Sequence, residues 1–390
     1  MSRPRLIHIE SVGALRDAAP QWDDLWWRSD VARPTVRAEL LAQWVEQFAP
    51  GARLHALAVE EEGRLVAALP LVPSLKFRWL KMAGMPSNEW SPAGDLLLDA
   101  AADAESALDL LVAAMRQLPW RLLWLNHVPL AAPRWQALAE AAGRARVSTD
   151  WHEHRQEGRI EIRHDLQAFD AGLSKKHRTK MARCTRRIAE RGEVRLEVMP
   201  RFEPGEVEPW LRRALEIEDR GWKGESGTSV LRSPGMFAFY LRQAQTLAAW
   251  GQLELAFLYC GEVPVSFIYG YAAKGVAHWQ KIGYDPQFAA CTPGQVLQWH
   301  LLRRFQEQPE REAVDTMGPV DRALAQWRPV LCPVGRLAIG PGRLLGRWLV
   351  YACKRWGPCL RRLRSGAGAD ARQGPGAEVA DPESAEPVTA

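Results

Sequence analysis

Two segments about 198 residues apart in the chain carry the same pattern. Residues 56–71 read ALAVEEEGRLVAALPL and residues 255–270 read LAFLYCGEVPVSFIYG, so that Gly63 aligns with Gly261. Each segment has two apolar runs around a polar turn, which is typical of a β-hairpin. An irregular loop, a helical pattern and a buried strand follow each hairpin. A repeat of this length predicts a duplicated α/β domain, and chance similarity of two hairpins is the alternative.

The chain length agrees with two domains. The chain has 390 residues, of which 47% are hydrophobic, enough for more than one core. We expect a mixed α/β (α+β) fold of tandem halves, each a mainly antiparallel sheet flanked by helices. The predicted parts are residues 1–155, 156–335, 336–364 and 365–390.

The expected elements follow from hydrophobic periodicity and from turn residues. Strands are predicted at 3–9, 54–75 (a hairpin), 120–125, 253–260, 263–271, 276–284 and 313–316. Helices are predicted at 14–28, 36–48, 104–117, 175–191, 206–221, 234–251 and 292–308. Ser233 and Pro234 are interpreted as the N-cap and first residue of the helix that ends at Gly251.

The charge of the chain is uneven. The net charge is +5, but residues 365–390 hold five acidic residues and one basic residue and are rich in Gly, Ala and Pro. This composition predicts a disordered tail, which leaves about +9 on the rest of the chain. A basic body favours an anionic partner.

The sequence shows no sign of export or membrane insertion. The first residues, MSRPRLIHIESVG, lack the apolar core of a secretion signal, and no apolar run approaches about 18 residues. The six cysteines are scattered without a CxxC pair, so we expect reduced thiols in a cytoplasmic protein. No cysteine or histidine spacing predicts a zinc site, and we expect no metal.

The predicted helix at 175–191 is strongly basic. Its apolar positions recur in steps of three and four, whereas the other positions hold eight Lys or Arg residues and one acid, Glu190. Eight like charges on one helix repel one another, which favours an anionic partner over a merely solvated face. The candidates are the phosphates of CoA, an acyl carrier protein, tRNA or anionic lipid. Lys175 and Arg178 are the candidate binding residues.

A second basic segment lies near the C-terminus. Residues 336–364 hold eight basic residues and no acidic ones, interleaved with Leu and Trp. This composition is typical of an interfacial amphipathic segment, so peripheral contact with the inner face of the membrane is one hypothesis. A terminal helix that docks on the body is the other.

The sequence Thr292-Pro293-Gly294-Gln295 lies where a strand is predicted to give way to a helix. Free N–H groups and the helix dipole at such a junction favour an anion such as a pyrophosphate, and Gly294 allows close approach to the backbone. An ordinary helix start is the alternative interpretation.

Several motifs in the second half carry a family resemblance. They are LSKKHRTKMARCTRRI (173–188), RGWKG (220–224), the GEVPVSFIYG hairpin (261–270), KIGYDPQF (281–288), TPGQVLQWHLL (292–302) and Asp315. In order and spacing, the chain resembles the CelD-like, cellulose biosynthesis-associated branch of the GNAT acyltransferases, which is related to the Fem-type peptidyltransferases. Only one glycine stands where the usual GNAT pyrophosphate loop has two small residues.

The resemblance implies an acyltransferase, of the N-acetyltransferase type, that uses acetyl-CoA or another acyl-CoA. Its acceptor would be an amine or hydroxyl group of a cell-envelope or polysaccharide-related compound. Thr292, Pro293, Gly294, Gln295 and Lys281 are the candidate cofactor-binding residues. Two alternatives stay open: a Fem-type transferase that takes its acyl group from aminoacyl-tRNA, and a non-catalytic membrane-surface protein whose GNAT site has decayed.

The same resemblance suggests catalytic residues. In direct transfer, an amine attacks the thioester carbonyl, so a base must take one proton and an acid must protonate the thiolate. Asp285 as the base and Tyr284 as the acid lie at the end of a predicted strand, and Asp315 is a second base candidate. Turn and cap roles are the alternative for all three residues.

The acceptor has its own candidate residues. The end of the helix predicted at 206–221 brings three carboxylates next to a Trp, which together can bind an amine. Glu216, Glu218 and Asp219 precede Trp222 and Lys223. A solvated helix face with Trp222 in the core is the alternative. In the first half we see no cofactor loop, and we interpret residues 87–92 as structural or as part of an acceptor cleft.

Overall fold

The structure is a computed structural model that describes residues 4–74, 80–199, 203–342, 346–352 and 354. The strands in this part of the chain are β1 (Arg5–Ile9), β2 (His55–Glu61), β3 (Arg64–Pro73), β4 (Met82–Gly84), β5 (Leu97–Leu98), β6 (Leu122–Pro129), β7 (Ser148–Glu161), β8 (Val194–Val198), β9 (Leu253–Cys260), β10 (Val263–Ala273), β11 (Val276–Tyr284), β12 (Ala313–Pro319) and β13 (Val330–Gly340). The labelled α-helices are α1 (Val12–Asp17), α2 (Ala19–Arg28), α3 (Ala38–Phe48), α4 (Ala104–Met115), α5 (Pro133–Arg144), α6 (Leu166–Gly172), α7 (Lys175–Ala189), α8 (Val207–Arg220), α9 (Trp222–Glu225), α10 (Met236–Ala249) and α11 (Pro293–Phe305). Residues 346–352 are helical as well. Short 3-10 turns are η1 (Pro34–Val36), η3 (Pro204–Glu206), η4 (Pro286–Cys291) and η5 (Leu324–Trp327).

The strands of the described residues form one sheet whose two ends have the same topology. Its order is β1-β2-β3-β4-β6-β13-β7-β12-β11-β10-β9-β8, with β5 paired to β3. Read from either edge, three antiparallel pairings are followed by a parallel one, β4 with β6 or β11 with β12. An antiparallel strand then completes each half. The topology confirms the predicted tandem halves.

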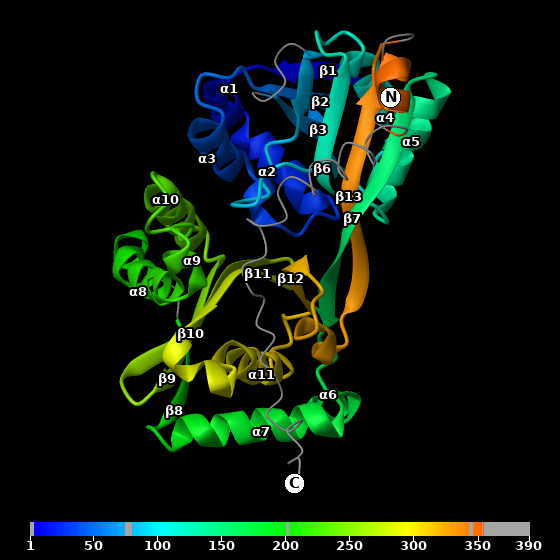
Figure 1. Ribbon diagram of the computed structural model, residues 1–390. Helices are drawn as coiled ribbons and strands as arrows, with labels where there is room; N and C mark the ends of the chain where they lie inside the picture. The colour runs from blue at the N-terminus through cyan, green and yellow to red at the C-terminus, as the bar shows by residue number, and fades with distance from the viewer. Residues whose placement is uncertain (1–3, 75–79, 200–202, 343–345, 353, 355–390) are drawn as a thin grey trace, which may run out of the picture. The chain divides into compact units, whose positions relative to one another are not determined.

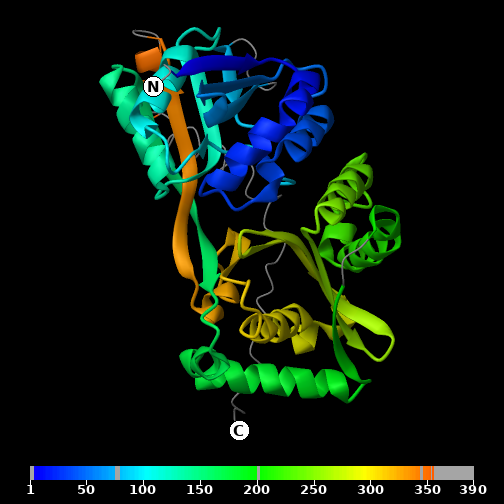
Figure 2. The same ribbon diagram turned by 180° about the vertical axis from the view of Figure 1, so that it is seen from behind.

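Each half is completed by a strand from beyond its own stretch of sequence. β13 pairs with β6 of the first half, and β7 pairs with β12 of the second half. These two long strands also pair with each other, from Val330 opposite Arg159 to Gly340 opposite Ser148, and run side by side between the halves (Figures 1 and 2). The predicted boundary between residues 155 and 156 therefore falls inside β7.

Both faces of each half are covered by helices, as the strand patterns require. In β2, Leu57 and Val59 join one apolar core, with α4 and α5, whereas Ala56 and Ala58 join another, with α1, α2 and α3. In β9, alternate residues likewise divide between a core with α7 and α11 and a core with α8 and α10. Successive side chains of a strand point to opposite faces, so each buried hairpin supports two cores.

The structure departs from the expected helix boundaries at two places. The helix predicted at 14–28 is two helices, α1 and α2, that meet at Ala18. Pro20 lacks an N–H donor and its ring clashes with the carbonyl four residues back, so one helix cannot continue through it. The start predicted at Ser233 and Pro234 is also wrong: α10 begins at Met236, after Gly235 with φ of 75°.

The sequence patterns missed α5, β7 and β13. Residues 336–340, which were expected in the basic amphipathic segment, are the end of β13, where Leu337 and Ile339 are buried in the first half's core. Residues 343–345, 353 and 355–364 of that segment and the tail at 365–390 lie outside the described residues. Among the described residues, no helix is both long and apolar enough to cross a membrane.

Candidate functional site

The parallel pairing of β11 with β12 is short. It joins Val276–His278 to Ala313–Asp315, whereas β11 continues to Tyr284 beside β10. Beyond Asp315, β12 keeps its pairing with β7, where Pro319 lies opposite Glu157. The two strands therefore part after His278, at the middle of the C-terminal half.

β11 carries a bulge where the strands part. Its register against β10 shifts so that Tyr269 lies opposite Lys281 and Gly270 lies opposite Trp279, which leaves Gln280 as the extra residue. The bulge brings backbone close to Gly270, where a Cβ would lie 2.0 Å from the His278 carbonyl oxygen. Bulges commonly redirect side chains at sites of function.

Replacing Gly270 with Ala is expected to disturb this bulge. The added Cβ meets backbone that cannot move aside, so the free energy of unfolding should fall by about 1–3 kcal/mol, as for an overpacked core. Urea denaturation of both proteins measures the change. Gly143→Ala in α5 is the matched control, because its Cβ would meet nothing within 4 Å. Equal stability of Gly270→Ala and the wild type would contradict this account of the bulge.

The residues Thr292 to Gln295 form the start of α11, as predicted. Thr292 has a left-handed backbone with φ of 43°, and Pro293 is at the first turn. The first N–H groups of a helix have no partner within the helix. A Cβ at Gly294 would lie 3.6 Å from Ile282 and 3.9 Å from Tyr284, which is ordinary contact. Packing alone therefore does not require glycine at position 294.

The basic helix α7 lies beside this helix start. It packs against η4 and α11 (Figures 1 and 2). Ser174 caps it by accepting the His177 N–H, and its buried side chains are His177, Met181, Cys184 and Ile188, in the predicted spacing. Lys180 Nζ donates to Gln295 Oε1 at 3.3 Å. Pro293 has no N–H, and the Gln295 and Val296 N–H groups donate to the Thr292 carbonyl. Lys180 therefore stands next to the Gly294 N–H and the positive end of the α11 dipole, and both favour an anion.

The remaining Lys and Arg residues of α7 face solvent. Lys175 and Arg178, the two predicted binding residues, are exposed. Within the described residues, none of the basic side chains from Lys175 to Arg187 forms an ion pair. The helix therefore presents an uncompensated positive surface.

Lys281 lies in a buried ion cluster on the opposite face of β11 from Ile282. Its Nζ is 3.2 Å from Glu218 Oε1 and lies over the rings of Trp90 and Tyr240. Burial lowers the pKa of Lys281 to about 8, although the neighbouring Glu218 carboxylate acts in the other direction. The lysine packs against α8 and α10, and the predicted cofactor loop at α11 is on the other side of the strand.

The predicted acceptor residues separate in the structure. Lys223 joins the buried cluster, with its Nζ 2.8 Å from Glu218 Oε1. Trp222 is 59% exposed, so it is not the core residue of the alternative interpretation. Glu216 is exposed and lies two positions from Glu218, on the other side of α8. The buried carboxylate at this end of α8 is therefore Glu218.

Glu218 is held by three donors. Lys223 and Lys281 bind Oε1, and the Val230 N–H donates to Oε2 at 3.1 Å. Burial raises its pKa, but the two ammonium groups and the hydrogen bonds outweigh burial, so the net pKa is below the usual value. Glu218, one of the three carboxylates predicted here, continues the apolar steps of Leu211, Ala214 and Leu215, which places it on the buried face of α8.

A polar pocket lies between the halves where β11 and β12 part. Its lining comes from both halves and includes Arg33, Asn88, Glu89, His127, Arg155, Glu157, Gln280, Asp315 and Met317. Gln280 Nε2 donates to the Trp90 carbonyl at 2.7 Å. Among the described residues, no donor reaches the buried Gln280 Oε1. Gln280 thus lines the pocket and is anchored to the 87–92 loop by its hydrogen bond to the Trp90 carbonyl.

Asp315 lies in this pocket together with two other carboxylates, Glu89 and Glu157. Its Oδ1 accepts the Met317 N–H at 2.8 Å. Burial raises the pKa of Asp315, while the Met317 hydrogen bond and the guanidinium groups of Arg33 and Arg159 act against this. A raised carboxyl pKa lies closer to neutral pH, which suits a general base.

Tyr284 and Asp285 do not line this pocket. Tyr284 lies six positions along β11 from His278, the strand partner of Asp315, which is about 20 Å at 3.3 Å per residue. Tyr284 is 39% exposed. Asp285 caps η4 by accepting the Gln287 N–H, and its other oxygen accepts from Arg220 at 3.0 Å. The structure therefore does not bring the three predicted catalytic residues together, and its geometry favours Asp315 as the base.

The loop at 87–92 links the halves. The Trp90 carbonyl accepts from Gln280 and from the Tyr240 hydroxyl, and Ser91 Oγ accepts from Gln243. The predicted place of this loop in the cleft agrees with the structure, since Asn88 and Glu89 line the pocket.

Residues 175–323 match the family model of the acetyltransferase (GNAT) domain. This region is a GNAT-type acyltransferase domain. It contains α7, the bulged β11, the start of α11 and Asp315. No curated protein matches the chain.

Solved structures share the fold over most of the chain. The structure of FemX matches with a TM-score of 0.60 and 10% identity, over 90% of this chain and 100% of FemX. The C-terminal domain of a protein assigned as a lysylphosphatidylglycerol synthetase from Agrobacterium fabrum matches with a TM-score of 0.51 and 13% identity, over 87% of this chain and 97% of that one. L-PGS from Bacillus licheniformis matches with a TM-score of 0.50 and 13% identity, over 85% and 96%. At these identities the likeness shows the fold alone, and the CelD-like branch stays a prediction.

Proposed function

We propose that this protein transfers an acyl group from acyl-CoA to an amine or hydroxyl group that enters the pocket between the halves. The observation that carries the proposal is the start of α11. The Gly294 N–H, the positive end of the α11 dipole and Lys180 meet there, at one end of the strand that leads to the pocket. A phosphate group of the donor fits this combination of donors and charge.

The two ends of the proposed donor site are joined by β11. Gly294 lies against Ile282, and the pocket begins at Gln280 and at Asp315, the partner of His278. Ile282 and His278 are about 13 Å apart at 3.3 Å per residue. The pantetheine arm of CoA can cover this distance in the gap between β11 and β12, so that its thioester reaches the pocket.

The reaction then follows from the pocket residues. The acceptor amine or hydroxyl attacks the thioester carbonyl, the C–S bond breaks, and the CoA thiolate leaves. Asp315 takes the proton that the acceptor loses, and the thiolate takes up one proton. Gln280 forms part of the pocket wall, held by its hydrogen bond to the Trp90 carbonyl. The acceptor class, a cell-envelope or polysaccharide-related compound, rests on the sequence resemblance.

A thermal-shift experiment with a Gly294→Val variant tests the donor site. Acyl-CoA at about 100 times its Kd is expected to stabilise the wild type by roughly 2.7 kcal/mol. Valine at position 294 should abolish the stabilisation, because its side chain occupies the space of the ligand beside the helix start. CoA, acetyl-CoA and longer acyl-CoAs are the probes.

Gly143→Val is the matched control, since it adds the same side chain to a helix where nothing lies within 4 Å. It should keep the response to acyl-CoA. A wild type that responds to no CoA, or a Gly294→Val variant that responds normally, would contradict the proposed donor site.

The exposed face of α7 favours a second candidate, a Fem-type transferase whose donor is aminoacyl-tRNA. The observation is the row of basic residues without ion pairs in the described part of the chain, which suits a polyanion. Bulk tRNA belongs in the same thermal-shift screen. A response to tRNA that falls steeply with salt, together with no response to CoA, would replace acyl-CoA by aminoacyl-tRNA as the donor.

A further inference from the structure

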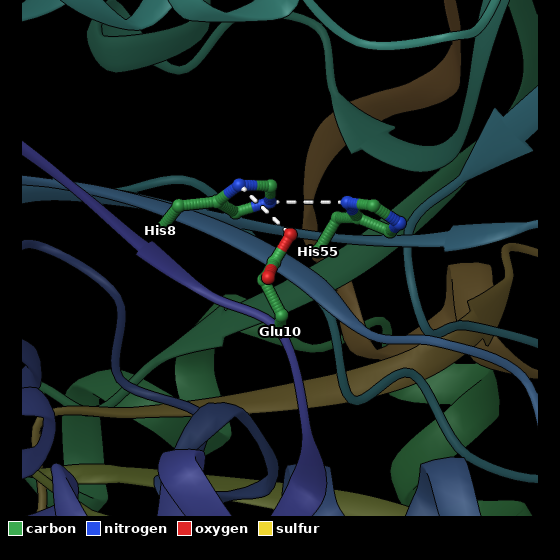
Figure 3. Close-up of side chains that lie close together, drawn as sticks. All are labelled: His8, Glu10 and His55. Atoms are coloured by element: carbon green, nitrogen blue, oxygen red, sulfur yellow. Dashed lines mark hydrogen bonds and ion pairs between the residues drawn. The ribbon is translucent and has the colours of Figure 1, made fainter.

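A cluster of potential metal ligands lies at the first edge of the sheet, in the N-terminal half. His8 and Glu10 come from β1 and the residue that follows it, and His55 comes from β2. His8 Nε2 is 3.0 Å from His55 Nδ1, and His8 Nδ1 is 3.4 Å from Glu10 Oε1 (Figure 3). One ligand atom from each residue lies within 4.8 Å of the others.

The strand register explains why these residues meet. Ile9 lies opposite Ala56 in the antiparallel pair of β1 and β2, and His8 lies opposite Leu57. The next pair along the strands is Glu10 and His55, which point to the same face as His8. Glu10 and His55 lie 45 positions apart in the sequence. This spacing shows no metal motif.

We propose that His8, Glu10 and His55 bind a divalent transition-metal ion, with Zn²⁺ as the ion that the two imidazoles and one carboxylate suit. Zn²⁺ takes His nitrogens at about 2.0–2.1 Å and carboxylate oxygens at about 2.0–2.2 Å, so its ligand atoms stand roughly 3.3–3.5 Å apart. His8 now presents Nε2 to His55 and Nδ1 to Glu10. One ion binds a single nitrogen of His8, so its ring must turn for the three residues to reach this spacing. Water takes the fourth position, on the side where His8 and Glu10 are open to solvent.

The surroundings hold two of the three ligands in place. Arg53 pairs with Glu10 Oε2, and Glu10 Oε1 faces the His8 ring. The ring of Trp120 packs against His55 with the centroids 4.7 Å apart. An oriented carboxylate and a fixed imidazole are typical of supported metal ligands.

Metal binding would tie β1 to β2. β1 is an edge strand that pairs with β2 alone in the described sheet, and a metal ion bound by both strands stabilises their pairing. The site belongs to the N-terminal half, and it is separate from the GNAT domain at residues 175–323. Its role is therefore structural, and its test does not depend on acyl transfer.

Isothermal titration with ZnCl₂ and a thermal shift test the site, on full-length protein without an affinity tag and after removal of metal by a chelator. We expect saturable binding of one Zn²⁺ per chain. At about 100 times the Kd, the Tm should rise by roughly 3–4 °C. His8→Gln and Glu10→Gln should each weaken binding by at least roughly 100-fold and remove the shift. Both residues are partly exposed, so these variants should fold, which circular dichroism checks.

His152→Gln on β7 is the matched control. Its ring also lies beside a second histidine, His154, at 5.1 Å between centroids, but no group of three ligands includes it among the described residues. It should bind Zn²⁺ as the wild type does. The proposal is overturned if the wild type shows no saturable Zn²⁺ binding, if His8→Gln and Glu10→Gln bind as the wild type does, or if His152→Gln alone loses binding.

Discussion

Replacing Asp315 with Asn is expected to lower kcat for acyl transfer by roughly 10²–10⁴-fold, the usual contribution of a general base. The KM for acyl-CoA should change little, because Asp315 lies in the pocket and the phosphate end of the donor lies at Gly294. Thiol release from acyl-CoA measures the rate, once a screen of amines and hydroxyl compounds has found an acceptor.

The pH dependence of kcat/KM gives a second readout. Burial raises the pKa of Asp315, so the wild-type rate should fall, as the pH is lowered, at a pH above the ordinary carboxyl pKa. This fall of kcat/KM at low pH should be absent in Asp315→Asn. Asp321→Asn is the control, because Asp321 is an exposed residue that caps η5. A larger loss in Asp285→Asn than in Asp315→Asn would assign the base to Asp285.

Replacing Asp95 with Ala is expected to lower the free energy of unfolding by about 3–5 kcal/mol, as for removing one partner of a buried ion pair. Asp95 is 1% exposed and accepts hydrogen bonds from Arg33 at 2.8 Å and Arg134 at 3.1 Å. The Trp135 indole N–H also donates to it at 3.0 Å. Without the carboxylate, two guanidinium groups lose their buried partner. Urea denaturation measures the loss.

Asp109→Ala is the matched control for Asp95→Ala. Asp109 pairs with Arg144 at 2.7 Å, but 48% of its side chain is exposed, so its loss should cost less than about 1 kcal/mol. If the free energy of unfolding fell by similar amounts in the two variants, burial would not explain the cost of removing Asp95. Since Arg33 also lines the pocket, Asp95→Ala should disturb the pocket as well as the fold.

Acid should weaken the same cluster. Burial raises the pKa of Asp95, but the guanidinium groups of Arg134 and Arg33 outweigh burial and hold the net pKa below its usual value. A carboxyl with a lowered folded-state pKa contributes stability above the unfolded-state pKa of 3.8. That contribution is lost as the pH falls below this value through the folded-state pKa.

The sequence by itself determined the features that depend on neighbouring residues. The hairpins around Gly63 and Gly261 form as predicted, because alternating apolar residues around a polar turn can bury both faces of a strand pair. The start of α11 at Thr292 and Pro293 was also predictable, since the signals of a helix start lie within a few residues. The basic and apolar faces of α7 follow from steps of three and four.

The tertiary structure alone decided which distant residues share a site. β7 and β13 were missed because their stability comes from pairing with each other over residues more than 150 positions apart, and β7 is too polar to show a strand pattern. Asp285 and Asp315 look equivalent in the sequence. Only the fold shows that Asp285 pairs with Arg220 and caps a turn. Asp315, in contrast, lies in a pocket with Gln280 and Arg33. Periodicity reports which face of an element is buried, but it carries no information about which other element covers that face.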